Sequence, residues 1–349
     1  MPLHRVHGLT RKENWCGSLA RYTSRMTVRW LACATALTSL LVTTPPGYVA
    51  QDVAQDVAQA AGQGAAPAGQ GAAPGAVDRT RLMADVTTLA SPAFEGRKAG
   101  SRGGLKAREW IVEQFTAIGL SPAGRDGYVQ PLSGGAANVL GRLPGRDPAA
   151  PTLIISAHYD HDGIKDGVLY PGADDNASGV AVLLAAARHF RANPPRHPLI
   201  FAAFDAEEEG LRGSRAFIAA NLVPRARIAL NINLDMVSRN DANEIYAAGT
   251  SHYPHLRPML DDIRTRSAVT ILFGHDRPTR TGGRRDDWTD LSDHASFHAV
   301  RIPFVYFGVE DHADYHKPTD TADTINPRFF GDVAEMIVEA VRTFDARLD

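Results

Sequence analysis

The sequence predicts one α/β domain of three layers, in which helices flank both faces of a mixed, largely parallel central sheet. Helix-like and strand-like patterns alternate from about residue 77 to the end of the chain, as α/β domains require. Segments 153–156, 199–204 and 228–234 are short and nearly all apolar, which suits strands buried on both faces of a parallel sheet. With 349 residues, 44% of them hydrophobic, the chain can bury a core of this size.

Each element is predicted from the spacing of its apolar residues, at three and four residues for helices and in short runs for strands. Turn-rich sequence, such as FEGRKAGSRGG between the first two helices, separates them. The predicted helices are residues 78–90, 103–118, 179–190, 211–220, 255–266, 293–299 and 326–348. The predicted strands are residues 128–132, 137–143, 153–156, 199–204, 228–234, 244–248, 269–273 and 303–308. Asn326 should cap the last helix, with Pro327 in its first turn.

The first 76 residues differ in composition from the rest. Residues 30–42 form an apolar run after basic residues, and this run is shorter than the ~20 residues that a membrane span needs. Such a run is typical of an export signal, with Met26 as an alternative start and an uncleaved anchor as the alternative interpretation. Residues 51–76 repeat Gln, Gly, Ala and Pro, which predicts a disordered linker.

These patterns predict a signal-peptide region at 1–50, a linker at 51–76 and a catalytic domain at 77–349. We therefore expect a secreted or periplasmic protein without stable membrane insertion after signal cleavage. Cys16 and Cys33 both lie in the segment to be removed, so the mature chain would have no disulfide, no thiol nucleophile and no multi-cysteine zinc site.

The charge balance argues against a nucleic-acid partner. The whole chain has 37 basic and 39 acidic residues, and residues 1–50 hold six of the basic and one of the acidic ones. Removing that segment leaves 31 basic and 38 acidic residues. A surface that binds the phosphates of a nucleic acid needs more basic than acidic residues.

Four predicted strands are followed by carboxylates or histidines. The side chains after strand 153–156 are His158 and Asp160; after 199–204, Asp205, Glu207, Glu208 and Glu209; after 228–234, Asp235; and after 303–308, Asp311, His312, Asp314, Tyr315 and His316. Ligands of open α/β sheets gather at the carboxyl ends of the strands. We therefore expect these side chains to form one site.

The chemistry of these side chains predicts a metal site. Histidine and carboxylate donors without sulfur suit zinc or a similar divalent ion. Two histidines and three carboxylates are more than one tetrahedral ion needs, but two ions bridged by a carboxylate, about 3.5–4 Å apart, would use them all. Asp160 is placed to orient the imidazole of His158. One of Glu207 and Glu208 could bind metal while the other accepts a proton from water.

Each motif also has an ordinary structural explanation. A Glu-Glu-Glu run is common where a helix starts, and Asp174-Asp175-Asn176 could be a turn with an N-cap. The order of the motifs, each after an apolar strand, favours a site over coincidence. Surface positions are predicted for seven other histidines, which are His161, His189, His197, His252, His255, His275 and His298.

In this order, the segments AHYDH, GADDNASGVA, DAEEEGLRGS, NLDMVSR, SDHASF and DYHKPTDT resemble the co-catalytic di-zinc aminopeptidase family. That family includes aminopeptidase S, aminopeptidase Y and the glutamate carboxypeptidase II group. The resemblance extends from about residue 78 to the C-terminus and implies the zinc-exopeptidase fold. The chain has no room for the protease-associated insert of many relatives, so a minimal catalytic domain is expected.

The resemblance also implies residue roles. One zinc ion would be held by His158, Asp175 and Asp235, and the second by Asp175, Glu208 and His316. The remaining implied roles are general base for Glu207, support of His158 for Asp160 and oxyanion stabilisation for Tyr315. The Asp-Asn-x-x-Gly pattern of the family favours Asp175 over Asp174 as the bridge, and implies a cis peptide bond after Asp175.

The function implied is hydrolysis of N-terminal peptide bonds by a monomeric aminopeptidase, with a metal-bridging water as nucleophile and Glu207 as general base. The alternatives are a one-zinc glutaminyl cyclase-like acyltransferase, a dipeptidase, carboxypeptidase or deacylase of the same clan, and a non-catalytic binding ectodomain. The 17-residue gap from His158 to Asp175, without a domain-sized insertion, favours the aminopeptidase. Loop 274–291 is expected either to line the specificity pocket or to be solvated.

Overall fold

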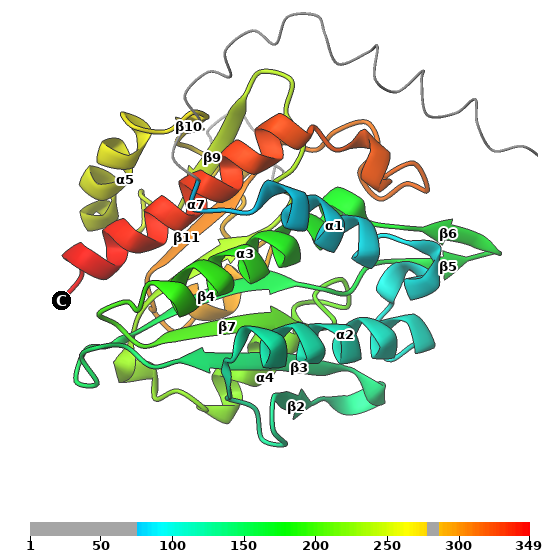
Figure 1. The fold of residues 1–349 in the computed structure, drawn as a ribbon, viewed down its shortest axis with the longest axis horizontal. Helices are drawn as coiled ribbons and strands as arrows, with labels where there is room; N and C mark the ends of the chain where they lie inside the picture. Colours follow the sequence, from blue (N-terminus) through cyan, green and yellow to red (C-terminus); the bar gives the residue numbers. More distant parts are fainter. Residues whose placement is uncertain (1–74, 278–285) are drawn as a thin grey trace, which may run out of the picture. The chain divides into compact units, whose positions relative to one another are not determined.

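A nine-stranded mixed sheet lies at the centre of this computed structural model, which describes residues 75–277 and 286–349 (Figure 1). Its order is β1-β3-β7-β4-β8-β11-β9-β10, and β2 pairs with β3. The predicted α/β class with a largely parallel core is confirmed. The predicted signal-peptide region, and the predicted linker up to residue 74, lie outside the described residues.

The strands of the central sheet are β1 (Ser121–Pro122), β2 (Val129–Pro131), β3 (Ala137–Leu143), β4 (Thr152–His158), β7 (Leu199–Phe204), β8 (Ile228–Leu234), β9 (Glu244–Ala248), β10 (Thr270–Leu272) and β11 (Phe304–Gly308). A separate antiparallel pair consists of β5 (Gly163–Lys165) and β6 (Val168–Tyr170). The helices are α1 (Arg79–Leu89), α2 (Arg102–Ile118), α3 (Gly179–Ala192), α4 (Arg212–Ala220), α5 (Arg257–Arg264), α6 (His294–His298) and α7 (Pro327–Arg347).

The middle of the sheet is parallel. β4 pairs in parallel with both β7 and β8, and β8 pairs in parallel with β11. Antiparallel pairing is found towards the edges, between β3 and β7 and between β9 and β11. All residues of β7 and β11 are buried, as expected for strands covered on both faces.

Side chains of the central strands alternate between two apolar clusters, one on each face of the sheet. Leu153 and Ile155 of β4 pack into the larger cluster with α1, α2, α3 and α7. Ile154 between them packs into a smaller cluster with Phe217 of α4 and Phe297 of α6. The period of two that defines a strand therefore builds a three-layer domain, and Figure 1 shows the first group of helices in front of the sheet.

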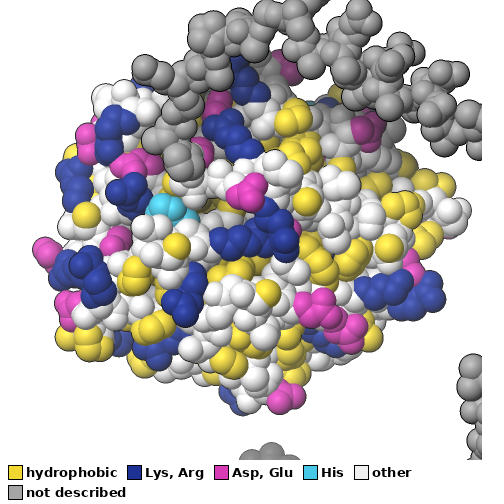
Figure 2. All heavy atoms as spheres, in the orientation of Figure 1, with side chains coloured by type: hydrophobic (Ala, Val, Ile, Leu, Met, Phe, Trp, Pro, Cys, Tyr) yellow, Lys and Arg dark blue, Asp and Glu magenta, His cyan; other side chains and the backbone are white. Residues whose placement is uncertain are grey.

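The helix boundaries follow the capping residues of the sequence. The side chain of Asn326 accepts a hydrogen bond from the backbone N–H of Phe329 at 3.1 Å, as predicted for the start of α7. The helix α2 ends at Gly119, whose φ of 81° suits glycine. None of the helices in the described part of the chain is both long and apolar enough to cross a membrane. Figure 2 shows acidic and basic side chains interspersed over one face of the molecule.

Candidate metal centre

The predicted site lies where four parallel strands end at the same edge of the sheet. The chain passes from β4 through α3 to its neighbour β7, and then through α4 to β8 on the other side of β4. Because α3 and α4 pack on opposite faces, the two connections diverge and leave a crevice at the carboxyl end of β4. His158 is the last residue of β4 and lines the small cavity at this edge of the sheet.

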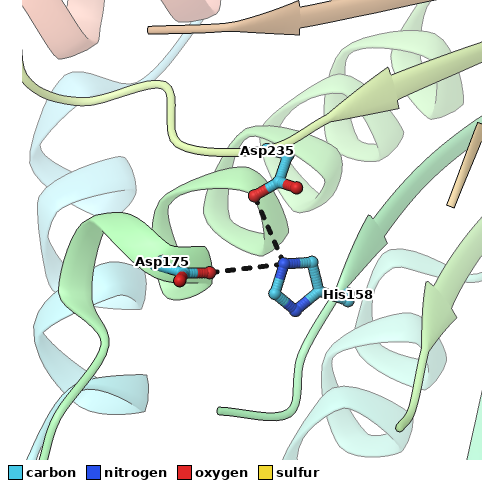
Figure 3. Close-up of side chains that lie close together, drawn as sticks. All are labelled: His158, Asp175 and Asp235. Carbon is cyan, nitrogen blue, oxygen red and sulfur yellow. Dashed lines mark hydrogen bonds and ion pairs between the residues drawn. The ribbon is translucent and has the colours of Figure 1, made fainter. Parts of the chain in front are cut away.

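His158 forms the first group of metal donors with two carboxylates. Its Nε2 lies 3.2 Å from Asp235 Oδ1 and 3.4 Å from Asp175 Oδ1, and Figure 3 shows the two carboxylates approaching this nitrogen from different sides. Its Nδ1 donates to the carbonyl oxygen of Asp160 at 3.1 Å. That hydrogen bond places the proton on Nδ1, so Nε2 can offer its lone pair to a metal.

The second group is formed on the other oxygen of Asp175. Asp175 Oδ2 lies 3.1 Å from His316 Nε2, and Glu208 Oε1 lies 3.6 Å from the same nitrogen. Because Oδ1 faces the first group and Oδ2 the second, Asp175 has the arrangement of a carboxylate that bridges two ions. The five side chains that the resemblance implies as ligands therefore lie together.

The loop that carries Asp175 is held by a buried carboxylate. Asp320 accepts hydrogen bonds from the backbone N–H groups of Asp174 and Asp175, at 3.0 to 3.1 Å. The Asn176 side chain donates to the carbonyl oxygen of Leu234 at 2.9 Å, which fixes this loop against the end of β8. The implied cis peptide bond between Asp175 and Asn176 is present.

Asp174, the competitor for the bridging role, is engaged elsewhere. Its Oδ1 accepts hydrogen bonds from the backbone N–H and the hydroxyl of Ser238, at 2.8 and 2.7 Å. Its Oδ2 lies 3.1 Å from His312 Nε2. Neither oxygen belongs to the groups around Asp175, so the geometry agrees with the preference for Asp175.

Asp160 was expected to orient the imidazole of His158 with its carboxylate, but the structure gives that carboxylate other partners. Its carboxylate lies 3.8 Å from His158 Nδ1, and the backbone carbonyl makes the closer contact. The two carboxylate oxygens instead accept hydrogen bonds from the backbone N–H groups of Glu207 and Glu208, at 3.0 and 3.3 Å. Asp160 therefore ties the end of β4 to the segment after β7, a link that the His-x-Asp spacing alone does not reveal.

A fully buried arginine joins the segments that carry the donors. The guanidinium of Arg97 donates to the carbonyl oxygens of Leu89, Tyr159, Pro171 and Gly172, at 2.7 to 2.8 Å. Burial lowers the pKa of Arg97 to about 10, and the nearby carboxylates oppose this change. It therefore remains a cation at neutral pH and holds the segments before Asp175 and after His158 at a fixed separation.

Glu207 and Tyr315 face the same small cavity as the donors. The cavity has a volume of about 70 Å³, and its apolar lining consists of Met236, Trp288, Leu291, Tyr306 and Val309. Burial, with the charges of Asp235 and Asp293, raises the pKa of Glu207 well above its ordinary value, although His158 opposes the shift. A carboxylate with a raised pKa is suited to accept and return a proton near neutral pH.

The charge of the site favours a cation. Burial, followed by the charge of Glu208, raises the pKa of Asp175, and burial also raises the pKa of Glu208. Crowded carboxylates of this kind repel one another, and bound divalent ions remove that cost. Nitrogen and oxygen donors without sulfur are those that zinc, or a similar ion, accepts. The residues present therefore fit divalent metal ions.

Two of the predicted surface histidines are buried, which corrects the sequence interpretation. His161 is 1% exposed and His197 is 0% exposed. His197 bonds Asp345 of α7 through its Nδ1, at 3.1 Å, and has a structural role. His161 lies beside Asp175 and Glu208 in the centre itself. Only its position one residue after Asp160, in AHYDH, could have indicated this.

Sequence reasoning assigned no role to Arg97 or Asp320. Asp320 belongs to the quoted motif DYHKPTDT, whereas Arg97 lies in a segment interpreted as a turn. Of the loop expected at 274–291, Trp288 and Leu291 line the cavity, in agreement with the specificity-pocket interpretation. Residues 278–285 of that loop lie outside the described residues.

Comparison with known proteins relates this chain to peptidases. The chain is 30% identical to aminopeptidase YwaD of Bacillus subtilis over 217 residues, which is 58% of this chain and 44% of that protein. Across the curated relatives first matched, the chain spans between 36% and 54% of their length.

Solved structures with the same fold include enzymes of two activities. A zinc aminopeptidase from Bacillus subtilis matches with a TM-score of 0.59 at 18% identity, covering 77% of this chain and 95% of its own. A glutaminyl cyclase from Bacteroides thetaiotaomicron matches with a TM-score of 0.60 at 18% identity, covering 78% of this chain and 99% of its own. These likenesses establish the fold and do not choose between the two activities.

The sequence profile of peptidase family M28 decides the family. It matches residues 138–341, which include every donor of both groups and both strands on either side of β4. Because this match covers more than half of the chain, the protein belongs to peptidase family M28.

Proposed function

We propose that this protein is an exported zinc aminopeptidase that holds two ions per chain and hydrolyses the N-terminal peptide bond of its substrates. The observation that carries the proposal is the placement of Asp175, whose two carboxylate oxygens face two separate groups of donors. The aminopeptidase name of the relative YwaD and the zinc named for the solved relative support the choice of reaction and metal.

In the proposed mechanism, the two groups of donors around Asp175 would hold divalent ions, which would supply a water of lowered pKa, towards about 7, and a polarised scissile carbonyl. Glu207 accepts the proton of the attacking water and later returns it to the leaving amine. The phenol of Tyr315, which lines the same cavity, donates to the oxygen that becomes negative. Burial raises the pKa of Tyr315, so it keeps this proton at neutral pH.

The charge of the cavity supports action at the amino end of a peptide. Five carboxylates line it, which are Asp175, Glu207, Glu208, Asp235 and Asp311. Asp311 and Glu207 belong to neither of the proposed ligand sets, so two acidic side chains face the cavity in addition to the ligands. A free α-amino group is a cation at neutral pH and is favoured there over a C-terminal carboxylate.

Substrate panels test this proposal. Aminoacyl-nitroanilides with a free amino group should be hydrolysed by the zinc-loaded protein, and their N-acetylated counterparts should not. Release of acetate or of a C-terminal residue from N-acetylated peptides, without hydrolysis of the free-amine nitroanilides, would indicate a deacylase or carboxypeptidase instead. Release of ammonia from peptides with N-terminal glutamine, without cleavage, would indicate a glutaminyl cyclase. An inactive protein that binds no metal would favour the binding ectodomain.

Export is part of the same proposal. The apolar run at 30–42 and the linker composition at 51–76 support export. The mass of the mature chain recovered outside the cytoplasm tests this part, because signal cleavage would remove the segment with both cysteines. A full-length chain retained in the membrane would contradict it.

A further inference from the structure

We propose that His161 is a further ligand of the second metal position, so that this position has four protein donors and the position at His158 has three. The inference rests on the proposed metallopeptidase function and goes beyond the ligands that the family resemblance implies. The four donors would be His161, Asp175, Glu208 and His316.

Two imidazole nitrogens approach the same pair of carboxylate oxygens. His161 Nδ1 lies 3.0 Å from Glu208 Oε1 and 3.6 Å from Asp175 Oδ2. His316 Nε2 lies 3.1 Å from Asp175 Oδ2 and 3.6 Å from Glu208 Oε1. The two rings are nearly perpendicular, at 72°, with their centroids 5.4 Å apart. Two imidazole nitrogens and two carboxylate oxygens are donors of the type that zinc binds.

The chain is built to hold the His161 ring in this place. The ring is buried against Gly172, whose φ is 58°, and a Cβ added to that glycine would lie 2.5 Å from two ring carbons. Arg97 bonds the carbonyl oxygens of Tyr159 and Gly172, so it fixes the two segments that enclose the ring. Rigid support of this kind is what a metal ligand requires.

The polar contacts of the His161 ring suit a ligand. Its Nε2 is buried and has no hydrogen-bond partner in the described part of the chain. The polar contacts of the ring are therefore made by Nδ1, and all of them are directed at the two carboxylates of the second group.

The two metal positions would then differ in their number of protein donors. The position at His158, with Asp175 and Asp235, would have three. The position at His316 would have four and would bind its ion more tightly, while the bridging water would still contact both ions.

Metal binding to His161→Ala tests the assignment. We expect the variant to lose affinity for one ion by more than about 100-fold, which exceeds the ~10–100-fold effect of a group that only orients a ligand. His316→Ala should weaken the same ion, and His255→Ala, at an exposed position, should change neither. Competition with a chelator measures both affinities. The visible absorption of the cobalt-loaded protein reports the ligand change independently, since it depends on coordination number.

His161→Asn separates a ligand from a positioning residue. Asparagine can donate a hydrogen bond to Glu208 but offers no imidazole nitrogen, so we expect it to lose the ion as alanine does. Rescue of both affinities by asparagine, or wild-type affinities and an unchanged cobalt spectrum in the alanine variant, would overturn the assignment. If alanine lowers the melting temperature enough to unfold the chain, the asparagine variant decides between the outcomes.

The same experiment distinguishes this inference from the proposed function. Hydrolysis of aminoacyl-nitroanilides is measured on the wild-type protein alone. If the wild type hydrolyses none of them while His161→Ala loses one ion, the aminopeptidase proposal fails and the ligand assignment stands. If the wild type is active and the variant keeps both ions, the ligand assignment fails and the aminopeptidase proposal stands.

Discussion

Glu207→Gln is expected to lower kcat by about 10²–10⁴-fold while both metal ions remain bound, because the amide cannot accept the proton of the attacking water. A change of this size corresponds to roughly 3–5 kcal/mol in the activation free energy. Glutamine keeps the size of the side chain, and the backbone N–H of residue 207 still donates to Asp160. The fold and the substrate KM should therefore change little.

Steady-state hydrolysis of an aminoacyl-nitroanilide, together with metal analysis of the same sample, checks this expectation. Glu209→Gln is the matched control, because Glu209 lies two residues away, is exposed and bonds Arg212 on the surface. The control should keep wild-type kcat. Near-normal activity of the Glu207 variant would exclude it as the general base.

Asp175→Ala is expected to abolish binding of both ions and to reduce hydrolysis to the uncatalysed background. The reason is that Asp175 Oδ1 lies beside His158 in the first group of donors, whereas Oδ2 lies beside His316 in the second. Asp235→Ala should instead remove only the ion at His158, because Asp235 contacts that group alone. Chelator competition, with two binding steps resolved, is the measurement.

Asp174→Asn is the control for the bridging assignment. The Asp174 carboxylate bonds Ser238 and His312, so this variant should keep both ions and lose about 1–3 kcal/mol of stability from the altered hydrogen bonds. Loss of both ions from Asp174→Asn, with retention in Asp175→Ala, would reverse the assignment.

The sheet, and the edge at which the metal donors lie, could be predicted because each strand is recognisable from its own short stretch of sequence. The predicted strands 199–204 and 228–234 have the observed bounds of β7 and β8, since each is a short apolar run that ends in a carboxylate. Parallel strands bring their carboxyl ends to one edge, so the donors after different strands could be expected together. The short β1 and the β5–β6 pair were not predicted, because they hold two or three residues each without a periodic apolar pattern.

The environment of a side chain could not be predicted in the same way. His161 follows Asp160 in a polar loop, and its burial results from Gly172 and from the segment that Arg97 holds, both distant in sequence. Arg97 is charged and lies in a turn-rich segment, so composition places it at the surface. Its burial is stabilised by four carbonyl oxygens, whose convergence depends on the tertiary fold.

The central claim is that two ions are bound on opposite sides of Asp175. Anomalous scattering at the zinc edge, from crystals of the zinc-loaded protein, tests it most directly. We expect two peaks, one between His158 and Asp235 and the other between Glu208 and His316, with Asp175 between them. A single peak with full occupancy under saturating zinc, or two peaks of which neither contacts Asp175, would contradict the account.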